Sequence, residues 1–212
     1  NMEAPEGSVF SEMCPDKGDL LNDVFKRLAW AVEEARKAKC KAGVDTQFVV
    51  GATGETDWLY IKATYQLYKG LKLRRIYYSG FEPIPGTPYE NKPPCASWRE
   101  HRLYQVSFLI RDYNFTLEEL QEVVDEEGFL WNEDPKLLYV KKHPELFPVD
   151  LNEASIWEIM RIPKIGPIRA RRIVELRKKK EIKRPSDLKG VIEDWVIRRI
   201  IPYVAFEKTT LL

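Results

Sequence analysis

The chain has 212 residues, of which 44% are hydrophobic and 32% are charged, with a formal net charge of +1. This length suits one large domain or two small ones, each with a hydrophobic core. No run approaches the roughly 18 apolar residues that cross a membrane, so we expect a soluble, cytoplasmic protein without a membrane partner.

The metal-binding residue types are sparse. The three cysteines, Cys14, Cys40 and Cys95, are widely spaced and odd in number, which fits neither a disulfide framework nor a CxxC metal site. With only two histidines in addition, we expect no metal site within this chain.

The charge is divided unequally along the chain. Residues 1–150 hold 19 lysines and arginines against 25 acidic residues, a net charge of −6. Residues 151–212 hold 15 against 8, a net charge of +7. This step predicts two modules, of which the basic one faces a polyanion or merely carries a solvated basic surface.

The first part of the chain predicts alternating strands and helices. Apolar spacing and breaker residues indicate a strand at 1–4, an amphipathic helix at 19–35, a strand buried on both faces at 46–52, a helix at 56–69 and a strand at 74–81. This order predicts an α/β fold in which crossover helices join parallel strands. Three strands cannot close a barrel, so we expect the chain to be the C-terminal part of a longer protein.

Two loops follow the carboxyl ends of predicted strands, where α/β folds bind ligands: FVVGATGETD at 48–57 and SGFEPIPGTP at 79–88. One interpretation of Gly51 and Gly54 is a tight turn between strand and helix. Glu55 would then lie near the N-terminus of the helix and interact favourably with the helix dipole. The other interpretation is a ligand site.

Together these loops resemble the later barrel strands of radical S-adenosylmethionine enzymes. The resemblance implies a partial parallel βα barrel over residues 1–96, with Gly51, Gly54, Glu55 and, more loosely, Glu3 at the cofactor. It also implies S-adenosylmethionine and a 4Fe-4S cluster in the parent protein. The family binds its cluster through three cysteines spaced CxxxCxxC, a triplet that this sequence lacks. We therefore expect neither group on this chain alone.

Residues 97–148 predict a helical linker. SWRE at 97–100 and TLEE at 116–119 have the form of capping boxes, and Asp134-Pro135 predicts a third helix start. The sequences REHRLYQVSFLIRDYNF and EDPKLLYVKKHPELFPVDLN are similar to a radical S-adenosylmethionine subgroup assigned to DNA modification or repair. In that subgroup a small basic domain follows the linker, and a uracil-glycosylase-like protein is the implied partner.

Residues 149–212 predict a small all-α domain. We expect Asn152 to cap a first helix, Ile162–Pro167 to form a hairpin turn, and Pro167 to start a second helix. That second helix is expected to bury Ile168 with its other apolar residues. A last helix is expected to have an apolar face that includes Trp195.

The segment IPKIGPIRARRI resembles the LPGIGP core of helix-hairpin-helix domains in DNA-repair and DNA-uptake proteins. A turn followed by a helix start presents free backbone amides and positive potential to an anion. We expect binding to nucleic acid, specifically double-stranded DNA, without sequence preference. The predicted site comprises Lys164, Ile165, Gly166, Pro167, Ile168, Arg169 and Arg172.

The resemblance has two departures. Lys164 replaces the first glycine, which could add a phosphate contact or hinder the turn. The second copy, at 190–199, lacks the GIG core and carries Glu193 and Asp194, which predicts a structural role. A protein-docking domain and a non-catalytic nucleic-acid-binding adaptor are the alternatives.

Overall fold

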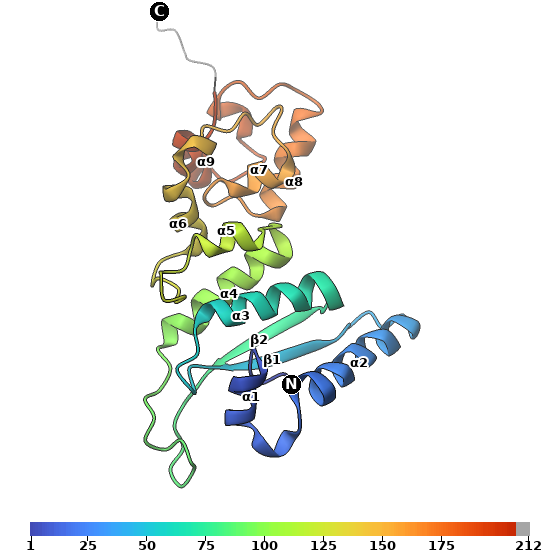
Figure 1. Ribbon diagram of the computed structural model, residues 1–212. Helices are drawn as coiled ribbons and strands as arrows, with labels where there is room; N and C mark the ends of the chain where they lie inside the picture. The colour runs from blue at the N-terminus through green and yellow to red at the C-terminus, as the bar shows by residue number, and fades with distance from the viewer. Residues whose placement is uncertain (207–212) are drawn as a thin grey trace, which may run out of the picture. The chain divides into compact units, whose positions relative to one another are not determined.

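The computed structural model describes residues 1–206 and separates the chain into two units (Figure 1). Unit 1 comprises residues 1–111 and 115–135, and within the described chain unit 2 comprises residues 112–114 and 136–206. Over residues 1–206 the protein is mixed α/β and about half helical, with two strands, both in unit 1. Within residues 1–206, no helix is long and apolar enough to cross a membrane.

Unit 1 contains a two-stranded parallel sheet. β1 (Asp45–Val50) pairs with β2 (Arg75–Gly80) in a register that places Phe48 opposite Tyr78. The connection between them contains α3 (Asp57–Gln66) and a π-helical turn (Leu67–Leu71). The predicted parallel strands and their crossover helix are therefore confirmed.

The prediction of a strand at residues 1–4 is wrong, because these residues form only one bridge to β1. The Glu3 amide donates to Gln47 O (3.0 Å), and the Val49 amide donates to Glu3 O (2.8 Å). Glu3 has a left-handed φ of 62°, and the next residue but one, Pro5, has no amide hydrogen to extend a ladder. A partial barrel over residues 1–96 is accordingly not confirmed.

Burial alternates along both strands. Phe48 and Val50 of β1 are buried with Ile76 and Tyr78 of β2, whereas Tyr77 is 39% exposed. Figure 1 shows α3 on one side of the strands and α1 (Gly7–Met13) and α2 (Lys26–Lys37) on the other. In β1 the residues between these buried positions are half-buried, so the prediction of a strand buried on both faces is met on one face only.

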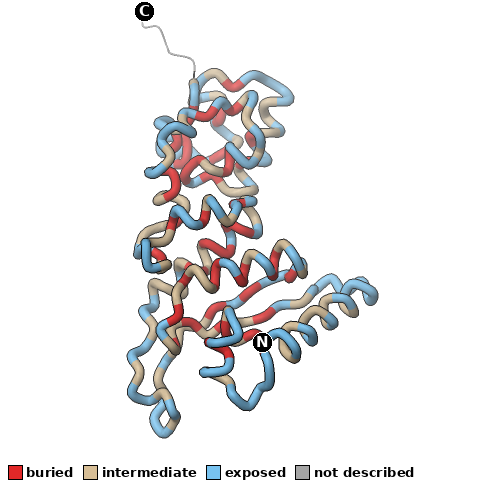
Figure 2. Tube along the Cα trace, in the orientation of Figure 1, coloured by how far each residue is buried: buried red, intermediate tan, exposed pale blue. Residues whose placement is uncertain are grey.

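The long helix predicted at 19–35 is present but poorly buried. Asp19 caps it by accepting a hydrogen bond from the Asn22 amide (2.7 Å), a π-helical segment (Leu20–Phe25) follows, and α2 (Lys26–Lys37) continues it. A short 3-10 turn (Pro15–Lys17) precedes the cap. Figure 2 shows exposed and half-buried positions along α2, which has no buried residue.

Residues 97–142 form α4 (Ser97–Asp112), α5 (Leu117–Gln121) and α6 (Pro135–Lys142). The Thr116–Glu119 capping box is confirmed, and α6 begins at the predicted proline. The first predicted capping box is wrong. Ser97 is already helical, and the Glu100 carboxylate instead accepts a hydrogen bond from the Gly80 amide (2.8 Å).

Unit 2 is helical. Its later α-helices are α7 (Ile156–Arg161), α8 (Pro167–Arg177) and α9 (Asp194–Ile200), with 3-10 turns at Pro144–Leu146, Pro185–Leu188 and Ile201–Tyr203. Fifteen buried apolar residues form its core: Val149, Leu151, Ile159, Met160, Ile162, Ile165, Ala170, Ile173, Ile182, Leu188, Ile192, Val196, Ile197, Ile200 and Val204. A parallel bridge joins the first and last of these residues, Val149 and Val204.

Candidate nucleic-acid interface

The helix before the hairpin turn begins later than predicted. Ser155, not Asn152, caps α7: the Ser155 hydroxyl accepts from the Glu158 amide (3.2 Å), and the Glu158 carboxylate accepts from the Ser155 amide (2.7 Å). Asn152 instead exchanges two hydrogen bonds with the backbone of Ile182 (3.0 and 2.9 Å). Asn152 therefore connects the segment before α7 to the segment that follows α8.

The hairpin turn (Ile162–Pro167) is anchored by apolar residues. Ile162 and Ile165 are 0% and 1% exposed, and the Ile165 amide donates to Ile162 O (3.2 Å). Between them Lys164 is exposed and has a left-handed φ of 64°. Lys164, which replaces the first glycine of the motif, thus faces solvent, while Ile162 and Ile165 anchor the turn in the core.

The hairpin turn presents unused backbone donors. Among residues 1–206, no acceptor takes the amides of Lys164, Gly166, Ile168 or Arg169. Pro167, the first residue of α8, has no amide hydrogen and so leaves the turn and the helix start open. Free amides at a helix start bind anions, and the positive end of the helix dipole lies at the same place.

Cationic side chains donate hydrogen bonds to two carbonyl oxygens of the hairpin turn. Lys136 Nζ donates to Ile165 O (2.7 Å), and Arg169 Nη1 donates to Lys164 O (3.0 Å). Gly166 has an extended backbone (φ −111°, ψ −179°), which any residue can adopt, but a Cβ there would lie 3.1 Å from the Tyr113 hydroxyl. The glycine therefore provides space beside the free amides.

Arg169 is bound by the second copy of the motif. Its guanidinium makes a bidentate pair with Glu193, with Nε–Oε2 at 2.9 Å and Nη2–Oε1 at 2.7 Å, and lies 5.5 Å from the centroid of the Trp195 ring. Hydrogen bonds from Arg169 lower the pKa of Glu193 to about 2. A phosphate reaching Arg169 must therefore compete with a carboxylate that stays ionised.

Two predictions of burial in this unit are wrong. Ile168 is 66% exposed, since α8 buries Ala170 and Ile173 on its opposite side. Trp195 is 48% exposed, while Val196 beside it is fully buried. These apolar side chains therefore extend the surface near the hairpin turn.

The structure divides the seven predicted interface residues between two places. Residues 164–169 lie together at the hairpin turn, whereas Arg172 lies one turn further along α8. There its guanidinium is 3.5 Å from Val191 O, in the turn Leu188–Ile192 that precedes α9. We refer to Leu188–Ile192 as the second turn.

Lys164→Gly is expected to raise the free energy of unfolding by about 0.5 to 1 kcal/mol. A left-handed conformation costs a residue with a Cβ about 1 to 2 kcal/mol, and the greater freedom of glycine in the unfolded chain offsets part of the gain. Urea unfolding followed by circular dichroism measures the change. Lys164→Gln, which loses the charge but keeps the Cβ, is the matched control. Equal stability of the two variants would contradict the strain.

The carboxylate of Glu55 is turned into its own loop. It is 6% exposed and accepts from the amides of Gly51 (2.5 Å) and Thr53 (2.9 Å), from the Thr53 hydroxyl (2.8 Å) and from the Tyr60 hydroxyl (2.5 Å). Burial is the strongest single influence and opposes ionisation. The four hydrogen bonds together outweigh it and lower the pKa of Glu55.

Of the other predicted cofactor residues, Gly51 and Glu3 also have close neighbours, whereas Gly54 does not. A Cβ at Gly51 would lie 3.1 Å from Cys95 Sγ and 3.2 Å from Arg99 Nη1, and the Glu3 carboxylate binds Lys17 Nζ (2.8 Å). The space beside Gly54 is open. These residues do not form an open site that fits S-adenosylmethionine. Residues 1–206 also contain no group of three or more His, Cys, Asp or Glu side chains that could hold a metal ion.

A buried ion pair beside this loop was missed by the sequence analysis. Arg99 Nε donates to Asp57 Oδ1 (2.6 Å), the Leu130 amide donates to Asp57 Oδ2 (2.9 Å), and the Arg99 guanidinium also donates to Glu55 O. Burial raises the pKa of the fully buried Asp57 despite the opposing charge of Arg99. The pair ties α4 to the start of α3.

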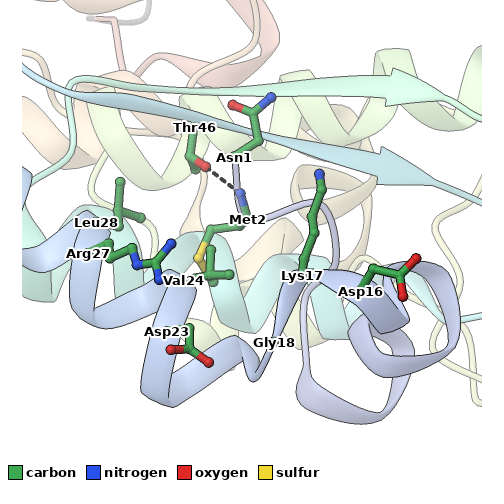
Figure 3. A pocket seen from close by; sticks show the side chains of 10 residues that line it. All are labelled: Asn1, Met2, Asp16, Lys17, Gly18, Asp23, Val24, Arg27, Leu28 and Thr46. Atoms are coloured by element: carbon green, nitrogen blue, oxygen red, sulfur yellow. Dashed lines mark hydrogen bonds between the residues drawn. The ribbon is translucent and has the colours of Figure 1, made fainter.

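A groove of about 770 Å³ in unit 1 lies elsewhere (Figure 3). It is bordered by Asn1 and Met2, by Asp16–Gly18 and by one side of the π-helical segment and α2. Its charges are mixed, and Gly51, Gly54 and Glu55 do not line it. Gly51, Gly54 and Glu55 are therefore separate from this groove.

Residues 147–193 match the helix-hairpin-helix motif. The match covers α7, the hairpin turn, α8 and the second turn, so it includes every free amide described above. The chain has no significant match among curated proteins or among solved structures. Within unit 2, residues 147–193 thus carry a helix-hairpin-helix motif, and such motifs commonly bind nucleic acid.

Proposed function

We propose that the protein binds double-stranded DNA through the hairpin turn, with little sequence preference. The observation that carries the proposal is the set of free amides at residues 164–169, which adjoins Lys164 and Arg169. Such groups bind phosphate oxygens and contact no base edges. The net charge of +7 over residues 151–212 favours the same ligand.

The full chain is expected to bind two unrelated duplexes of equal length with equal affinity. If about three phosphates are neutralised, the logarithm of the association constant should fall with the logarithm of salt concentration with a slope near −2.7. Fluorescence anisotropy over a salt series measures both quantities. Absence of binding at low salt, or a strong preference for one duplex, would overturn the proposal.

A protein-docking module is the second candidate. The exposed Ile168 and Trp195 favour it, because apolar side chains beside a turn are common in protein interfaces. The salt series separates the two functions, since an apolar interface would give no DNA binding.

We also propose that the chain belongs to a longer radical S-adenosylmethionine protein that modifies or repairs DNA. The support is the resemblance of the two loops, together with the parallel order of β1 and β2. In this proposal the cofactor and the cluster bind the parent protein. A segment encoding CxxxCxxC upstream of residue 1 is the expected finding. A start codon directly before residue 1 would favour the non-catalytic adaptor.

The proposed parent protein carries with it the proposal of a uracil-glycosylase-like partner. Co-purification of the two full-length proteins from a common expression host tests that association directly. Failure to co-purify would remove the partner without affecting the DNA-binding proposal.

A further inference from the structure

A second basic feature of unit 2 lies away from the hairpin turn. It is a groove of about 550 Å³ between α8 and the second turn. Three cationic residues line it, Arg171, Arg172 and Lys179, together with one acidic residue, Glu175, and with Leu176, Gly190 and Val191. The groove therefore has a strong excess of positive charge.

Part of this positive charge has no close partner within the protein. Among residues 1–206, the side chains of Arg171 and Lys179 make no hydrogen bond or ion pair. Arg172 donates one long hydrogen bond to Val191 O (3.5 Å) and interacts electrostatically with Glu193. The only carboxylate of the groove, Glu175, is paired with Lys178 at 2.6 Å. By contrast, Arg169 at the hairpin turn is already paired with Glu193.

The backbone of the second turn leaves room for a ligand. Gly190 is exposed, its φ of 76° is left-handed, and no atom lies within 4 Å of the place where a Cβ would be. No acceptor among the described residues takes its amide hydrogen. An anion could therefore approach this donor closely while the three cations surround it.

We propose that this groove is a second phosphate-binding site, which takes the sugar-phosphate backbone of nucleic acid. The inference rests on the proposed DNA-binding function and extends it to a groove of which the predicted site included only Arg172. Arg171 and Arg172 lie on α8, and Lys179 follows the end of this helix at Arg177. The hairpin turn contributes amides, whereas the groove contributes mainly side chains.

The test compares two double variants of the full chain on one labelled duplex. Arg171→Gln/Lys179→Gln removes two cations from the groove. Arg198→Gln/Arg199→Gln removes the same charge from exposed positions of α9 that do not line it. Losing two phosphate contacts is expected to weaken binding at least about tenfold at 100 mM salt and to reduce the salt slope by about 1.8. The α9 variant is expected to change affinity less than about twofold.

Three results would overturn the inference. A groove variant with native circular dichroism and unchanged affinity and slope shows that the groove is not a site. Equal losses in both variants show an effect of net charge alone. A parent chain that binds no duplex removes the proposed function itself, and the groove site with it. The first two results leave the hairpin proposal intact, so the failures are distinguishable.

Discussion

Gly166→Val is expected to weaken duplex binding at least about tenfold, or about 1.4 kcal/mol, because its side chain would cover the free amides of the hairpin turn. Hydrogen bonds from amides to a charged acceptor contribute about 1.5 to 3 kcal/mol each, so loss of one is enough. The extended backbone of Gly166 accommodates valine, and unit 2 should still fold.

Two variants show how valine acts. Gly166→Ala adds only the Cβ and should lose less affinity. Tyr113→Phe combined with Gly166→Val removes the hydroxyl 3.1 Å from the new Cβ, and a return of binding would attribute the loss to displacement of Tyr113. Anisotropy gives the affinities and circular dichroism the fold. A well-folded Gly166→Val chain that binds like the parent would show that the hairpin turn is not the site.

Glu55→Gln is expected to lower the free energy of unfolding by about 3 kcal/mol at pH 7, because buried donors left unsatisfied cost about 1 to 3 kcal/mol each. Hydrogen-bond donors approach both carboxylate oxygens, so the NH₂ group of glutamine must face donors on one side. Glu126→Gln, at an exposed position of the same unit, is the matched control. Urea unfolding measures both. Equal stabilities would contradict the role of Glu55 in holding its loop.

The stabilities of the parent and of Glu55→Gln are expected to respond differently to pH. The folded protein holds the pKa of Glu55 below its ordinary value of 4.5. The ionised carboxylate therefore contributes stability above that value, and the contribution is lost as the pH falls toward the lower pKa of the folded state. Denaturation at pH 7, 5, 4 and 3 should show the gap between parent and Glu55→Gln narrowing. A constant gap would contradict the lowered pKa.

Local sequence signals predicted the elements that depend on neighbours in the chain. The apolar runs of β1 and β2 and the proline that opens α8 each fix a conformation locally. Residues 1–4 failed as a strand because Glu3 and Pro5 end the extended stretch after one bridge. Ile168 failed as a core residue because it lies about 200° around the helix from the buried Ala170.

The sequence predicted only the part of the interface that lies in one continuous segment of the chain. The hairpin turn could be identified from IPKIGP, because its amides belong to one short segment. The pairing of Arg169 with Glu193 joins residues 24 positions apart, and the basic groove joins α8 to Gly190. Neither leaves a periodic or spaced pattern. The network around Glu55 depends in the same way on Tyr60 and on the later residue Arg99, which donates to the Glu55 carbonyl.

The bridge between Val149 and Val204 has a consequence for how the helical module can be used. The Val149 amide donates to Tyr203 O (2.9 Å) and the Ala205 amide donates to Val149 O (2.9 Å), so the backbone enters and leaves this region at a single point. Segments with adjoining ends can be transplanted between hosts or placed in a surface loop without stretching either junction. Residues 149–205 thus have adjoining ends, whereas Lys136 and Tyr113, which lie beside Ile165 and Gly166 of the hairpin turn, are outside this segment.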